Sequence, residues 1–188
     1  TGIRNVGIGH NALSANTTAN YNVAVGRSCM SANTEGHSNV AMGYFALQQN
    51  TTGDYNVALG TNSLDANTTG NNNVAIGRNA LTVDTTADNN TAVGHEALKL
   101  NTTGENNTAV GSGTLDACTT GPRNVGVGSF AMTTSTTAEE CVAVGQAALQ
   151  NLTTGNFNTA VGQSAGFFMT TGTKNTAVGR AALGQSTT

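Results

Sequence analysis

The sequence predicts an all-β fold, a parallel β-roll (β-solenoid) of eleven 17-residue coils that forms one repeat domain over residues 1–188. Three observations predict it. A phrase of the form Asn-Val-Ala-Val-Gly recurs at a constant spacing of 17 residues, without insertion or deletion. Within each copy, residues two apart are β-branched or otherwise apolar, as in a short strand. Between the copies, runs of Asn, Thr and Gly have the composition of turns.

The repeat covers the whole chain. Copies of the phrase start at residues 5, 22, 39, 56, 73, 90, 107, 124, 141, 158 and 175. We number the positions of one period from 1 to 17, so that Asn5 is repeat position 1 and Tyr21 is repeat position 17. No stretch is left over for a linker or a second domain, and self-similarity of this kind is the signature of a repeat architecture.

The strand of each coil is expected at repeat positions 2–4. Position 2 is always Val or Thr, and position 4 is apolar in every copy, so we expect position 4 to point into the interior. Position 3 is always Ala or Gly, which suggests that the opposite face is covered too. Position 9 is Leu or Met except at Gly166, where we expect Phe167 or Phe168 to replace the missing side chain.

Two turns close each predicted coil. The Gly at position 5, present in every copy, indicates a positive φ or a close backbone approach. The Asn-Thr-Thr-Gly run indicates a second turn, so that a coil reads as strand, turn, short strand or extended piece, turn. Stacked coils would form a rod about 50 Å long. The position 1 Asn, replaced only by Cys141, and the Thr pair, broken only by Glu35, would then form ladders.

Composition excludes several classes of protein. The chain has 32 Thr, 25 Asn and 24 Gly, with 4% aromatic and 9% charged residues, which argues against a compact enzyme domain. Its net charge is −3 and its basic residues are scattered, so we do not expect nucleic-acid binding. No apolar run reaches the length of a membrane span. Because a start Met and a signal sequence are missing, we expect a processed chain or a segment of a longer one.

One coil carries too few large apolar side chains to offset the backbone entropy of ordering it. The small Ala or Gly at position 3 would allow a second chain to approach closely. The residues themselves therefore predict a homo-oligomer of more than one chain, without setting the number.

The run Asn-Val-Ala-Ile-Gly-Arg-Asn-Ala-Leu over residues 73–81 resembles the S-V-A-I-G-x-x-A repeat of YadA-like head domains in trimeric autotransporter adhesins. Similar repeats occur in phage and viral tail or surface fibres. The resemblance covers all eleven repeats and implies a left-handed β-roll assembled as a homotrimer. The family repeat is shorter, and no neck, coiled-coil stalk or membrane anchor follows here, so a fibre shaft fits at least as well as an adhesin head.

We find no constellation for catalysis, and we predict no enzyme, no cofactor and no metal site. His10, His37 and His95 lie in different coils and do not form a cluster. The odd set of Cys29, Cys118 and Cys141 lacks Cys-x-x-Cys spacing, and we expect free thiols.

Aromatic residues collect where the repeat varies. The candidate receptor or glycan contacts are Tyr21, Tyr44, Phe45, Tyr55, Phe130 and Phe157. Exposed aromatic rings can stack on sugars or enter a partner's pocket, whereas local packing over turns is the alternative.

The sequence predicts a structural or adhesive fibre segment, extracellular on a cell surface or virion, that attaches to a glycan or receptor. Alternatives are a purely structural spacer or self-assembling filament, and an ice-binding solenoid prompted by the Thr ladders.

Overall fold

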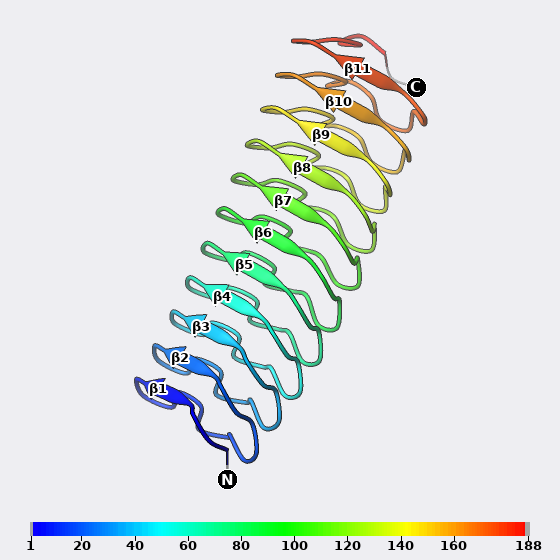
Figure 1. Ribbon diagram of the computed structural model, residues 1–188. Helices are drawn as coiled ribbons and strands as arrows, with labels where there is room; N and C mark the ends of the chain where they lie inside the picture. Colours follow the sequence, from blue (N-terminus) through cyan, green and yellow to red (C-terminus); the bar gives the residue numbers. More distant parts are fainter. Residues whose placement is uncertain (1, 187–188) are drawn as a thin grey trace.

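The structure is a computed structural model that describes residues 2–186. Short parallel strands stack in chain order into one sheet, and each pairs with the next at a register of 17 residues (Figure 1). The strands are β1 (Val6–Ile8), β2 (Val23–Val25), β3 (Val40–Met42), β4 (Val57–Leu59), β5 (Val74–Ile76), β6 (Thr91–Val93), β7 (Thr108–Val110), β8 (Val125–Val127), β9 (Val142–Val144), β10 (Thr159–Val161) and β11 (Thr176–Val178). The predicted β-solenoid and its strands at repeat positions 2–4 are confirmed.

Each coil contains one strand within residues 2–186, so of the two alternatives expected after the first turn, a short strand or an extended piece, the strand does not form. The rest of the coil is a series of turns, because positions 7 and 9 adopt left-handed backbone, as at Asn79 (φ 59°) and Leu81 (φ 50°). These turns still pair from coil to coil. The Met30 amide, for example, donates to the Ala46 carbonyl at 3.0 Å.

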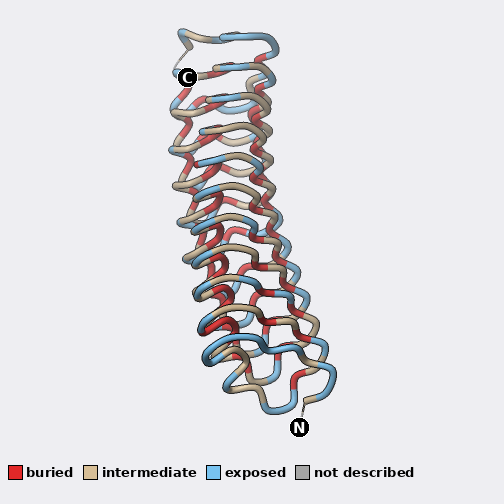
Figure 2. The backbone as a smooth tube through the Cα atoms, turned by 90° about the vertical axis from the view of Figure 1, so that its left-hand side faces the viewer, coloured by how far each residue is buried: buried red, intermediate tan, exposed pale blue. Residues whose placement is uncertain are grey.

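The interior is lined by small residues of the sheet and by the position 9 column. Ala75 in β5 and Leu81 are fully buried, and the equivalent residues of other coils belong to the same core. Buried positions follow one another from coil to coil along the rod (Figure 2). A Cβ added at Gly7 would lie 3.8 Å from Cδ1 of Leu13, which shows that position 3 faces the chain's own leucine column.

Two expectations about the strand were therefore wrong. Position 4 does not point inside: the exposed fractions of Ile8, Met42 and Val178 are 59%, 52% and 69%. The small face does not receive another chain, because the chain's own position 9 side chains fill it. The space between strand and leucine column holds only Ala or Gly. At Gly126 even a Cβ would lie 2.6 Å from Cγ2 of Thr114.

The position 5 glycines behave as predicted. Their φ angles run from 121° at Gly179 to 146° at Gly43. A Cβ at Gly94 would lie 2.4 Å from the carbonyl oxygen of Gly111 in the next coil. Both the positive φ and the close backbone approach are present, and both exclude a side chain.

The coil that contains Gly166 is repacked differently from the prediction. Phe168 is 52% exposed, whereas Met169 is buried. A Cβ on Gly166 would lie 2.7 Å from Cδ2 of Leu149 and 3.2 Å from Sδ of Met169. Leu149 and Met169, rather than Phe167 or Phe168, thus occupy the space of the missing leucine.

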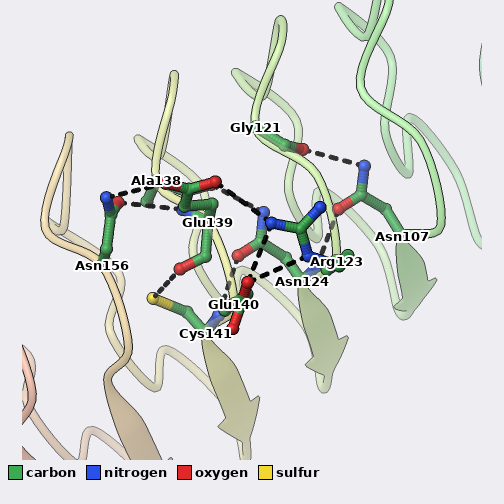
Figure 3. Close-up of polar contacts among 9 residues, drawn as sticks. All are labelled: Asn107, Gly121, Arg123, Asn124, Ala138, Glu139, Glu140, Cys141 and Asn156. Atoms are coloured by element: carbon green, nitrogen blue, oxygen red, sulfur yellow. Dashed lines mark hydrogen bonds and ion pairs between the residues drawn. The ribbon is translucent and has the colours of Figure 1, made fainter.

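The position 1 asparagines form a ladder in which the side-chain amides bond to the backbone; only at the end of the described chain does one bond to another, where Asn175 Nδ2 donates to Asn158 Oδ1 at 3.2 Å. Asn107 Nδ2 donates to the Gly121 carbonyl at 2.9 Å, and Asn107 Oδ1 accepts from the Asn124 amide at 2.9 Å (Figure 3). Each side chain therefore joins two turns of the solenoid. The position 13 threonines form a second ladder, as where Thr51 Oγ1 donates to the Thr68 carbonyl at 2.9 Å.

Cys141 takes the place of asparagine in the position 1 ladder. Its thiol donates to the Gly155 carbonyl at 3.3 Å, and its sulfur accepts from the Asn158 amide at 3.4 Å. The thiol thus keeps both kinds of bond that the amide makes, with a weaker donor and acceptor.

A third ladder runs along position 16, next to the strand. The Asn20 amide donates to His37 Nδ1 at 2.9 Å, and the His37 amide donates to Asp54 Oδ1 at 2.6 Å. Side chains, not carbonyls, accept these amide protons. Pro122, the one proline of the chain, lies in this column, so its missing N–H removes no backbone ladder bond.

Candidate interaction surface

The outward side of the sheet is its most distinctive surface. Residues alternate from outside to inside along β2 to β11: in the third coil Asn39 and Ala41 are buried, whereas Val40 and Met42 are exposed. We call the side chains at repeat positions 2 and 4 of the coils the outward sheet face. Its most exposed apolar members are Val6, Ile8, Val40, Met42, Ile76, Val110, Val161 and Val178.

This face is long and apolar. The sheet extends about 50 Å along the stack, at about 4.8 Å per strand. Repeat positions 17 to 6 span about 20 Å across it, at about 3.3 Å per residue. The outward side, margins included, therefore measures on the order of 1,000 Å², and the side chains at positions 2 and 4 form its mainly apolar centre. A surface of this kind can be buried in an interface with a protein partner.

The candidate aromatic residues lie along the two margins of the outward sheet face. Tyr21, Tyr55 and Phe157 occupy position 17, before the strand, and are 52%, 62% and 45% exposed. Tyr44 and Phe130, after the strand at positions 6 and 7, are 40% and 47% exposed. The rings are thus spread along the rod and do not gather at one site.

Neighbouring side chains hold two of these rings. The guanidinium of Arg27 lies 5.7 Å from the centroid of the Tyr44 ring, and the Tyr44 and Phe45 centroids are 3.9 Å apart. Phe45 itself is half-buried. On the other margin, Arg4 lies 5.3 Å from the Tyr21 ring centroid and donates to its hydroxyl. These rings therefore pack against neighbouring side chains and are also partly exposed to solvent.

A charged cluster lies on the position 17 margin between β8 and β9. Arg123 Nη2 contacts Glu140 Oε1 at 2.8 Å and Glu139 Oε2 at 3.3 Å (Figure 3). All three side chains are solvent-exposed, so the cluster contributes little to stability. It does place one basic and two acidic side chains of adjacent coils beside the outward sheet face.

The histidines lie in separate coils. Within residues 2–186, no group of three or more His, Cys, Asp or Glu could hold a metal ion. His10 and His95 are exposed at position 6, whereas His37 belongs to the position 16 ladder.

The cysteines are free and buried. Burial raises the pKa of the Cys29 and Cys118 thiols to about 11, and it also raises the pKa of Cys141. The thiolate, which is the reactive form, is therefore scarce at neutral pH.

We expect these thiols to react slowly with an aromatic disulfide reagent while the protein is folded. Burial blocks access, and the raised pKa suppresses the thiolate. At about pH 8 the folded protein should release less than one equivalent of chromophore over minutes, and unfolding in urea should release about three. Rapid release of the full amount from the folded protein would contradict this arrangement.

The sequence did not lead us to predict the polar columns at positions 12 and 16. The recurring Asn, Asp and His residues at these positions are the signal that could have indicated them.

No helix in the described part of the chain is long and apolar enough to cross a membrane. The chain matches no family model, no curated protein and no solved structure.

Proposed function

We propose that this chain is a segment of an extracellular homotrimeric fibre, a left-handed β-roll whose three copies bury their outward sheet faces against one another. The exposed apolar stripe along β1–β11 is the observation that carries the proposal. A stable interface buries about 800 Å² on each partner, and the outward side of this sheet is on the order of that size.

The thin interior supports the same assembly. The interior of each coil contains chiefly one Leu or Met and a few Ala, as Leu81, Ala75 and Ala80 illustrate. Burying two further β-branched or long apolar side chains per coil would contribute roughly 25 cal/mol for each Å² removed from water. Homo-oligomeric interfaces of this kind are also more apolar than the remaining surface.

The proposed role of the fibre is attachment to a glycan or receptor on a cell surface. Tyr21, Tyr44, Phe45, Tyr55, Phe130 and Phe157 are the proposed contacts, because exposed rings can stack on sugar faces. A purely structural spacer is the second candidate. The constant register from coil to coil favours it, because stiffness alone requires no binding site.

Binding assays on a glycan array and on whole cells distinguish attachment from a purely structural spacer. Attachment predicts binding that Tyr44→Ala or Tyr55→Ala weakens by about tenfold, a loss of about 1.4 kcal/mol. Absence of binding to either surface would leave the spacer as the function.

Assembly is tested by mass in solution. We expect about three times the 18.9 kDa of one chain. Met42→Asp combined with Val110→Asp places charge on the outward sheet face and should yield monomers or aggregates, because a buried unpaired charge is costly.

Thr52→Asp combined with Thr120→Asp is the matched control. It adds the same charge at exposed repeat position 14, away from the sheet, and should leave the trimer intact. A wild-type mass of 18.9 kDa at micromolar concentration would contradict the trimer.

A further inference from the structure

A column of polar side chains runs through the interior at repeat position 12. We call Asn16, Asn33, Asn50, Asn67, Asp84 and Asn101 the interior amide column. In its regular part, Nδ2 of each residue donates to Oδ1 of the residue one coil earlier: Asn50 to Asn33 at 2.7 Å and Asn67 to Asn50 at 2.9 Å. Each rung thus needs an N–H donor from the rung that follows.

Asp84 interrupts this pattern, because a carboxylate has no proton to donate. Its Oδ1 accepts from the Ala87 amide at 3.0 Å. Its Oδ2 lies 3.5 Å from Nδ2 of Asn90 and 3.4 Å from Nδ2 of Asn101. Oδ1 of Asn67, which the rung at position 84 should satisfy, is buried and has no hydrogen-bond partner.

No cation compensates a charge at Asp84. The neighbouring side chains that contact it, Asn90 and Asn101, are neutral amides. The charged group whose field acts on it is Asp88, which has the same sign. The ion pairs formed within residues 2–186 do not include Asp84. Its side chain is fully buried, so an ionised carboxylate here has lost water without gaining a counter-ion.

We propose that Asp84 is held in the folded chain as a neutral carboxylic acid whose Oδ1 proton is donated to Oδ1 of Asn67, and that the middle of the rod loosens when this proton leaves to solvent. Protonation restores the bond between these two rungs, because it supplies the donor that Oδ1 of Asn67 lacks. Oδ1 is the atom to carry the proton, since Oδ2 already accepts from Asn90 and Asn101 in the following coil, whereas Asn67 lies in the preceding coil. The device belongs to a single chain and does not rest on the trimer.

The direction of the pH dependence follows from the burial. Burial raises the pKa of Asp84 from 3.8 to about 7, against smaller opposing effects of its hydrogen bonds. A folded pKa above the unfolded value means that the contribution of Asp84 to stability is complete below about pH 4 and is lost as the pH rises to about 7 and beyond. Over that window the folding equilibrium constant should fall about tenfold per pH unit.

Asp84→Asn tests the proposal at constant size. Asparagine is the regular residue of the column, so the variant should fold, and its Nδ2 can donate to Asn67 permanently. In urea unfolding at fixed protein concentration, we expect the wild-type midpoint to fall between about pH 5 and about pH 8 and the variant midpoint to lose that slope. Asp54→Asn is the matched control. It removes the same charge at position 16, where Asn71 already serves as an acceptor, and should keep the slope.

An infrared measurement reports the proton directly. At about pH 6, where exposed carboxyl groups are ionised, the wild-type protein should show a carboxylic-acid C=O band that is absent from Asp84→Asn. Hydrogen exchange should show amides near β5 and β6 losing protection first as the pH rises, after correction for intrinsic exchange. A missing carboxylic-acid band, or an unchanged slope in Asp84→Asn, would overturn the proposal.

Discussion

Gly94→Ala is expected to destabilise the solenoid by about 3 kcal/mol or more. Gly94 has a φ of 144°, in a region that costs other residues about 1–3 kcal/mol. The new Cβ would also lie 2.4 Å from the carbonyl oxygen of Gly111 and 2.6 Å from its carbonyl carbon. These are backbone atoms, so the clash can be relieved only by separating two coils. Urea unfolding followed by circular dichroism measures the loss.

Gly179→Ala separates the two contributions. Gly179 has the same role in the last described coil, with a φ of 121°, but a Cβ there would meet nothing within 4 Å. It should therefore show the torsional cost alone, about 1–3 kcal/mol. Equal losses for the two variants would show that the coil-to-coil contact is not what position 5 requires.

Asn73→Ala is expected to cost about 2–6 kcal/mol, a loss set by hydrogen bonds rather than packing. Asn73 is fully buried, its Nδ2 donates to the Ala87 carbonyl at 2.7 Å, and its Oδ1 accepts from the Asn90 amide at 2.9 Å. Alanine leaves both backbone groups buried and unpaired, at about 1–3 kcal/mol each. Amide exchange at Asn90 should accelerate together with the shift in urea midpoint.

Asn73→Cys is the control for this prediction, and the protein contains its precedent. Cys141 occupies the equivalent position and keeps both bonds at 3.3 and 3.4 Å. Under reducing conditions, Asn73→Cys should therefore retain more stability than Asn73→Ala. If alanine and cysteine were equally tolerated, the backbone bonds of the ladder would contribute little.

Much of the fold could be predicted because the same residue types recur at the same repeat positions, and each recurrence indicates the same local backbone conformation. Val, Ala and Gly at fixed positions indicated the strand and its end, and the glycines of position 5 indicated a positive φ that Gly94 and Gly43 display. The predicted side chain for the Gly166 coil was wrong. Met169 rather than a phenylalanine fills the space, because which neighbour reaches a cavity depends on backbone direction.

The surface was harder to predict than the repeat. Tyr21, Tyr44 and Tyr55 were expected in exposed positions, and they are exposed. The apolar residues beside them, such as Ile8 and Met42, were expected inside, and they form the outward sheet face instead. The buried carboxyl of Asp84 also became visible only once the coils were stacked, since its partners lie 17 residues away or in adjacent turns.

By itself, the sequence determined the coil length, the place of each strand and the glycine turns, because these follow from local backbone preferences repeated at a constant period. Only the tertiary structure decided which side of the strand is buried. Both sides of a strand such as Val74–Ile76 are apolar, so hydrophobicity does not distinguish them. The decision depends on volume: the leucine column leaves room for Ala75 and not for Val74 or Ile76, and the larger side chains therefore lie outside.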